Sequence, residues 1–104
     1  MKKVTDQNLA LDVLSGTCLR GYLDNTTYSD LIQLFGEPTF NEPSGDDKIQ
    51  REWVVEHEGN YFTIYDWKTY DLNYTMNKLN EFNVGGKINA MNFIDAVQKA
   101  KASL

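Results

Sequence analysis

Residues 49–58 carry the clearest hydrophobic and polar pattern of the chain, an alternation with a period of two. One set of positions holds Ile49, Arg51, Trp53, Val55 and His57, and the other holds Gln50, Glu52, Val54, Glu56 and Glu58. This alternation is typical of a strand with one buried and one polar face. We therefore predict a strand here, with Trp53 pointing into the core.

The run 61–67 is rich in residues that favour strands, and the connection Glu58-Gly59-Asn60 before it suits a tight turn. The two runs are expected to pair as an antiparallel hairpin at the centre of the fold. One face of the second run holds Phe62 and Ile64, and the other holds Tyr61, Thr63, Tyr65 and Trp67. A single small sheet buries one face fully, so we expect Phe62 and Ile64 to point inward.

Residues 28–35 carry the signals of a short helix. Thr27 and Asp30 have the spacing of a capping box with the shorter acid. The apolar stripe behind them consists of Leu31, Leu34 and Phe35. Gly36 can adopt the left-handed conformation that closes a helix, and Pro38 cannot continue one, so a helix of about two turns is predicted.

A second helix is predicted after Asn89, a favourable N-cap residue. Its apolar positions recur at helical spacing and comprise Ala90, Phe93, Ile94, Val97 and Leu104. Before it, Phe82-Asn83-Val84 is predicted to be a short strand that enters a strand-to-helix turn at Gly85-Gly86-Lys87.

The other segments have weaker patterns. Residues 17–24 alternate loosely and are predicted to form a short strand, whereas residues 39–48 are predicted to be a loop. Residues 68–81 fit a long loop or a ragged strand near residues 72–76. Residues 1–15 fit neither the strand period nor the helix period.

The length of 104 residues allows one hydrophobic core but not two. Residues 1–104 are therefore expected to form a single α+β domain, with residues 1–15 as a loosely packed N-terminal segment. The predicted architecture is a small antiparallel sheet with two helices, in the order β-α-β-β-(β)-α.

The composition limits the cellular location and the class of binding partner that we expect. No apolar run approaches the roughly 20 residues of a membrane helix, and residues 1–7 lead into no secretory signal, so we expect a cytoplasmic protein without a membrane partner. Ten Lys and Arg residues against fifteen Asp and Glu residues give a net charge of −5. This charge repels a phosphate backbone on average and argues against nucleic-acid binding.

Residues suited to catalysis or metal binding are sparse in the sequence. Cys18 is the one cysteine and His57 the one histidine, so a His-rich metal site has no second imidazole. His57 is expected at the end of a strand, exposed to solvent, and no serine lies in a Gly-x-Ser-x-Gly context. We predict no catalytic residue, no metal site and no cofactor, and hence a protein that is not an enzyme.

Several short motifs together resemble a family of small uncharacterised proteins encoded by tailed bacteriophages. The motifs are Arg20-Gly21-Tyr22-Leu23-Asp24, Thr27-Tyr28-Ser29-Asp30-Leu31, Phe35-Gly36-Glu37-Pro38, Asp47-Lys48, Trp53, Thr63-Ile64-Tyr65-Asp66-Trp67-Lys68 and Val84-Gly85-Gly86-Lys87. The similarity covers roughly residues 19–100, and the chain departs from the family pattern at Phe82-Asn83-Val84. The resemblance implies a phage accessory protein in the bacterial host cytoplasm, a class that commonly acts by stoichiometric binding.

Aromatic residues are dense around the predicted hairpin and mark the first candidate binding surface. The candidate residues are Tyr61, Tyr65, Trp67, Lys68 and Tyr70. Aromatic side chains on an outer sheet face can anchor a protein partner or stack on a base. The first hypothesis is an inhibitor of a host or defence protein, such as a CRISPR complex, that binds through these residues and the 68–81 loop. An aromatic outer face also has apolar area to hide, which predicts a homodimer.

A second candidate site lies at Gly85, Gly86 and Lys87. Backbone amides before a helix, together with a lysine, favour an anion. The alternative hypothesis is therefore a protein that binds or sequesters a nucleotide or another phosphate compound, with Tyr65 or Trp67 stacking on the base. A plain strand-to-helix turn would use the same two glycines, and the sequence lacks the spacing of a phosphate-binding loop.

Overall fold

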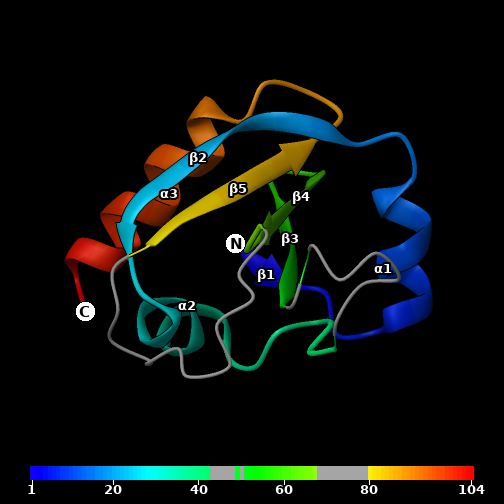
Figure 1. Ribbon diagram of the computed structural model, residues 1–104. Helices are drawn as coiled ribbons and strands as arrows, with labels where there is room; N and C mark the ends of the chain where they lie inside the picture. The colour runs from blue at the N-terminus through cyan, green and yellow to red at the C-terminus, as the bar shows by residue number, and fades with distance from the viewer. Residues whose placement is uncertain (43–48, 50, 68–79) are drawn as a thin grey trace.

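The fold is a five-stranded antiparallel sheet with three helices, in a computed structural model that describes residues 1–42, 49, 51–67 and 80–104 (Figure 1). The elements are β1 (Lys2–Lys3), α1 (Gln7–Leu14), β2 (Cys18–Thr26), α2 (Tyr28–Phe35), β3 (Glu52–His57), β4 (Asn60–Tyr65), β5 (Asn80–Gly86) and α3 (Met91–Ala102). The strand order across the sheet is β1-β3-β4-β5-β2. The predicted α+β class with an antiparallel sheet is confirmed.

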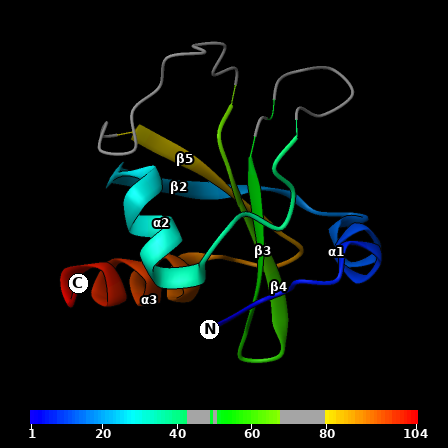
Figure 2. The same ribbon diagram turned by 90° about the horizontal axis from the view of Figure 1, so that it is seen from below.

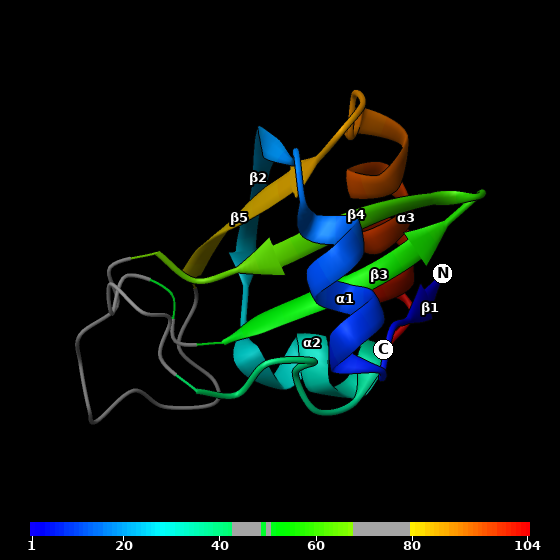
Figure 3. The same ribbon diagram turned by 90° about the vertical axis from the view of Figure 1, so that its right-hand side faces the viewer.

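The helices lie on both faces of the sheet. Helices α2 and α3 lie on one side of the β3–β4 hairpin and α1 on the other (Figure 2), and α1 crosses in front of β3 and β4 with α3 behind them (Figure 3). The face under α2 and α3 is called the inner face, and the face that carries α1 is called the outer face. Within the described residues, no helix is both long enough and apolar enough to cross a membrane.

The β3–β4 hairpin forms at the predicted place, and the two strands pair from Glu52 opposite Tyr65 to His57 opposite Asn60. Its turn consists of Glu58 and Gly59, which have φ angles of 51° and 82°. Two consecutive residues with positive φ are the requirement of a type I′ turn, whose twist matches that of the flanking strands. The hairpin supplies two of the three inner strands of the sheet.

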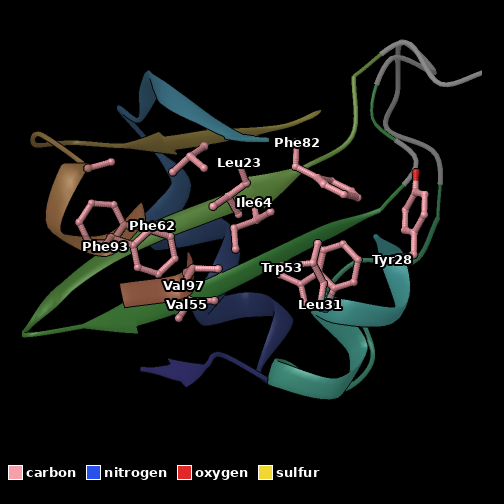
Figure 4. Packing of buried hydrophobic residues seen from close by; sticks show 12 residues of the cluster. Leu23, Tyr28, Leu31, Trp53, Val55, Phe62, Ile64, Phe82, Phe93 and Val97 are labelled. Carbon is pink, nitrogen blue, oxygen red and sulfur yellow. The ribbon is translucent and has the colours of Figure 1, made fainter. Parts of the chain in front are cut away.

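The main core lies on the inner face and is rich in aromatic rings (Figure 4). Trp53 is fully buried, as predicted, and its indole Nε1 donates a hydrogen bond to the Gly36 carbonyl at 3.0 Å. Phe82 packs edge-on against Trp53, with 6.4 Å between ring centroids. Phe62 and Ile64 also point into this core, which confirms the predicted inner face of the second strand.

Helix α2 begins and ends where the sequence predicts. The Thr27 hydroxyl accepts a hydrogen bond from the Asp30 amide, and the Asp30 carboxylate accepts one from the Thr27 amide, which completes the capping box. Gly36 follows the helix with a φ angle of 80°. Local signals alone were sufficient here because both helix ends are satisfied by residues within the segment.

The N-terminal segment contains two elements that the pattern did not reveal. Residues 1–15 contribute β1, which pairs with β3, and α1, which is capped by the Asp6 carboxylate. Three helices therefore stand where two were predicted. Val4 and Ala10 are buried against Val54, so the expectation that Val54 lies on a polar face is wrong: α1 covers it.

The C-terminal half differs from the prediction at the glycines. Strand β5 runs through Gly85 and Gly86, and α3 begins only at Met91, so the predicted strand-to-helix turn at Gly85-Gly86-Lys87 is wrong. The Asn89 side chain still accepts a hydrogen bond from the Met91 amide at 2.8 Å. Most of the predicted 39–48 and 68–81 loops lies outside the described residues.

Candidate functional site

The outer face of the sheet carries the candidate site, and strand pairing arranges its side chains in rows. One row crosses four strands and consists of Tyr22, Asn83, Tyr65 and Glu52. The neighbouring row consists of Leu19, Gly85, Thr63 and Val54. Directly paired residues project from the same face of a sheet, so each row presents its side chains together.

Helix α1 covers only part of this face. It packs on Val54 and Tyr61, at the β3 and β4 side of the sheet. Beyond it, Leu19 and Tyr22 on β2 are 48% and 47% exposed, and Trp67 just after β4 is 45% exposed. Together with the half-buried Tyr65 they form an apolar and aromatic surface, here called the outer patch (Leu19, Tyr22, Tyr65 and Trp67).

Tyr65 pairs across the sheet with Asn83 and Glu52 and contacts one other member of the outer patch. Its ring meets the Trp67 ring edge-on, with 6.3 Å between centroids. Burial raises the pKa of the Tyr65 hydroxyl above its ordinary value, a hydrogen bond with the Asn83 side chain lowers it, and the charge of Glu52 raises it. The phenol therefore stays neutral at physiological pH and offers a hydrogen-bond donor beside an apolar ring.

A groove with a volume of about 670 Å³ opens next to the outer patch, between α1 and the segment 38–42. We call it the α1 groove. It is lined by Gln7, Leu11, Leu14, Pro38, Thr39, Phe40, Asn41, Glu42, Ile49 and Glu52. Its volume is in the usual range of ligand-binding clefts.

Glu52 lies in the α1 groove at the end of the row that contains Tyr65. Its carboxylate accepts a hydrogen bond from the Thr63 hydroxyl on β4. Burial raises the pKa of Glu52, the Thr63 hydrogen bond lowers it, and the nearby charge of Asp66 raises it. Among the residues that the structure describes, no lysine or arginine nitrogen lies within 4.0 Å of this carboxylate.

The segment 38–42 is held in place by the edge of β3. Phe40 forms a β-bridge with Glu52, and its amide donates to the Glu52 carbonyl at 3.0 Å. The Thr39 hydroxyl donates to the Val4 carbonyl and accepts from the Val54 amide. The Gln7 side chain donates to the Thr39 carbonyl. Both walls of the α1 groove are therefore anchored to the sheet.

The residues of the predicted aromatic surface are only partly together. Tyr65 and Trp67 lie in the outer patch, whereas the half-buried Tyr61 packs in the cluster under α1. Lys68 and Tyr70 lie outside the described residues. Leu19, Tyr22 and Glu52 are not among the predicted site residues; the loose alternation over residues 17–24 was the available signal for the first two.

The predicted phosphate site has a different geometry from the expected one. Gly85 and Gly86 are buried in β5, and both pair with β4 and with β2. A Cβ atom on Gly85 would lie 2.9 Å from the Thr63 methyl carbon, and one on Gly86 would lie 2.9 Å from the Phe62 ring. The two glycines thus permit close packing within the sheet rather than presenting amides at a helix start.

Lys87 follows β5 and is exposed. The Arg20 guanidinium donates to the carbonyls of Gly86 and Lys87, both at 3.0 Å. These contacts tie the end of β5 to β2. Phosphate binding at Gly85, Gly86 and Lys87 stays a prediction. The helix-terminal amides on which it was based are not at these residues, because α3 begins at Met91.

The polar side chains best suited to catalysis or metal binding, His57 and Asp66, contact residues of the core and the sheet. His57 has a side chain only 15% exposed, and its ring lies 5.8 Å from that of Phe93, so its expected exposure is wrong. The buried Asp66 carboxylate accepts hydrogen bonds from the Tyr28 hydroxyl and the Arg51 amide. In the described part of the chain, no three His, Cys, Asp or Glu side chains are placed to hold a metal ion.

Comparison of the chain with protein-family models, curated proteins and solved structures gave no match.

Proposed function

We propose that this chain is a non-enzymatic accessory protein of the phage type that binds and inhibits a host or defence protein in the bacterial cytoplasm. The outer patch is the proposed binding surface. The observation that carries the proposal is the gathering of Leu19, Tyr22, Tyr65 and Trp67 on the part of the outer face that α1 leaves uncovered.

The chemistry of the outer patch supports a protein partner. Tyrosine and tryptophan are enriched at the energetic centres of protein interfaces because each buries a large rigid surface and also offers a polar atom. Tyr65 is already half-buried and in contact with Trp67, so its ring loses little freedom on binding. The resemblance to small phage proteins supplies the biological context of the proposal.

The experiment is affinity purification of partners from bacterial lysate with the full chain as bait. The test variants are Tyr22→Ala and Trp67→Ala, and the matched control is Met91→Ala, because Met91 is 63% exposed on α3. We expect a stoichiometric partner that the control retains and that each test variant loses or binds at least tenfold more weakly. Failure to recover a partner, or full binding by folded test variants, contradicts the proposal.

Nucleotide binding is the second candidate function, and one observation favours it. The Tyr65 ring lies beside Gly85, 3.7 Å from the position that a Cβ atom there would take. A base stacked on Tyr65 or Trp67 would therefore lie close to β5. Calorimetry with mono-, di- and cyclic nucleotides tests it, with Lys87→Ala as the variant that should lose binding; absence of heat at millimolar nucleotide rejects it.

A further inference from the structure

The α1 groove combines apolar walls with negative charge. Leu11, Leu14 and Phe40 contribute apolar surface, and Glu42 and Glu52 contribute carboxylates. Among its lining residues that the structure describes, none is a lysine, an arginine or a histidine. A long basic side chain has the matching chemistry, because its methylene stem packs on apolar walls while its charged end reaches a carboxylate.

The Glu52 carboxylate is positioned before any partner arrives. Its backbone is fixed between Tyr65 on β4 and the bridge to Phe40, and its side chain is held by the Thr63 hydroxyl. Partial burial, with no described lysine or arginine nitrogen within 4.0 Å, makes ionised Glu52 unfavourable, and the raised pKa agrees with this. A cation that entered the groove would offset this cost.

The described charges next to Glu52 are of both signs, and the negative one acts on its carboxylate. Asp66, which is buried just after β4, raises the pKa of Glu52 through its charge. Arg51, the adjacent residue, places its guanidinium 5.5 Å from the centre of the Tyr28 ring. The net charge of −5 adds a general attraction for basic partners.

The α1 groove adjoins the outer patch where Glu52 pairs with Tyr65. Glu52 is the cross-strand neighbour of Tyr65, and Tyr65 contacts Trp67. A partner segment that covers Tyr65 therefore lies beside the groove residue Glu52.

We infer that the α1 groove receives an arginine or lysine side chain of the protein partner, with Glu52 as its ion-pair acceptor and Leu11, Leu14 and Phe40 against its stem. This inference rests on the proposed function, since it names the chemistry of the partner segment that docks beside the outer patch.

The probe is the tripeptide acetyl-Leu-Arg-Leu-amide, titrated into the ¹⁵N-labelled full chain and followed by NMR. Its control is the same peptide with citrulline, which keeps the shape of arginine and removes the charge. We expect saturable shifts of the amides of Leu11, Asn41 and Glu52 with the arginine peptide, and at least tenfold weaker binding of the citrulline peptide.

Two protein variants complete the test. Glu52→Gln keeps an acceptor for the Thr63 hydroxyl and should weaken binding of the arginine peptide about tenfold. Glu56→Gln makes the same charge change at an exposed position of β3 outside the groove and should leave binding unchanged. The NMR spectrum shows directly whether each variant is folded. If Glu52→Gln does not fold, Glu42→Gln serves as a second groove variant.

The inference is overturned if the groove amides show no saturable shift, if the citrulline peptide binds equally, or if a folded groove variant binds as the wild type does. Its failure is separable from that of the proposed function. Loss of partner binding in Tyr22→Ala and Trp67→Ala tests the outer patch, whereas the peptide titration uses no partner.

Discussion

Glu52 has a role in the structure that its position in the sequence pattern does not indicate. In the pattern it belongs to the polar face of an alternating strand, where glutamates normally meet solvent. In the fold its neighbours on the outer face are α1, Phe40 and Tyr65, which remove much of that solvent. The sequence pattern does not reveal this position, because one wall of the groove comes from α1, which lies about forty residues earlier in the chain.

The raised pKa of Glu52 predicts a pH-dependent cost in stability. The unfolded chain has the ordinary pKa near 4.5 and the folded state a higher one, so the folded state holds this proton more tightly. The resulting stabilisation is complete below about pH 4.5 and is lost as the pH rises through the folded pKa. Glu52→Gln should therefore raise the melting temperature at pH 7 relative to wild type, and raise it less at pH 4.

Thermal melts of both proteins at the two pH values check this prediction, with Glu56→Gln as the exposed control. A melting temperature that falls at pH 7 in Glu52→Gln, or that shifts equally at both pH values, would show that ionised Glu52 does not destabilise the folded state.

Gly85 gives a second prediction at this scale. An alanine at this position places its Cβ 2.9 Å from the Thr63 methyl carbon and 3.3 Å from the Cys18 carbonyl oxygen, one of which is rigid backbone. We expect Gly85→Ala to lower the free energy of unfolding by about 1–3 kcal/mol in the absence of any ligand. Urea unfolding measures it. An unchanged midpoint would mean that the glycine is free for another purpose, such as close approach of a phosphate.

At the scale of elements, the parts specified by local signals could be predicted and the parts specified by distant contacts could not. The hairpin and α2 carry their own turn and cap residues. Helix α1 buries Ala10 and leaves Leu9 and Leu11 42% and 61% exposed, so only part of its hydrophobic pattern faces the sheet. Strand β5 ends in two glycines, which in the sequence indicate a turn. In the structure the Thr63 side chain packs on Gly85 and the Phe62 ring packs on Gly86, which explains both glycines.

Ala10 is the contact through which α1 depends on the sheet. It is fully buried against Val4 and Val54, so a carboxylate in its place would lie without a partner. We expect Ala10→Glu to lower the free energy of unfolding by about 2–4 kcal/mol. It should also abolish peptide binding in the α1 groove, because one wall of the groove is displaced.

Chemical denaturation and the NMR titration measure these two effects. Asn8→Glu, an acidic substitution at an exposed position of the same helix, is the control and should leave both quantities near their wild-type values. Wild-type stability in Ala10→Glu would mean that α1 is not firmly packed on the outer face.

Among the described residues, one edge of the sheet is covered and the other has no further strand, although α3 side chains donate to the Asp24 and Asn25 carbonyls near the end of β2. At the β3 edge, β1, Thr39 and Phe40 occupy the backbone groups of the strand. At the opposite edge, the nine-residue β2 has mostly exposed residues and no strand beyond it in the described sheet. An exposed edge strand is a template for pairing with another chain.

The β2 edge, together with the outer patch, supports the prediction of a homodimer. We expect light scattering to give a mass that rises from monomer toward dimer at tens of micromolar protein. Leu19→Lys, which places a charge on the exposed edge strand, should shift this equilibrium toward monomer. A strictly monomeric wild-type mass would reject self-association and leave β2 available for a different partner.

Site-specific photocrosslinking tests the central claim, that the outer patch is the binding surface, most directly. A photoreactive phenylalanine analogue is placed at Tyr22 in one protein and at Met91, on the other side of the sheet, in a second. After irradiation in bacterial lysate, the account predicts one dominant adduct from the Tyr22 position, suppressed by excess unlabelled protein, and no such adduct from the Met91 position. Equal adducts from both positions, or none from Tyr22, would contradict it.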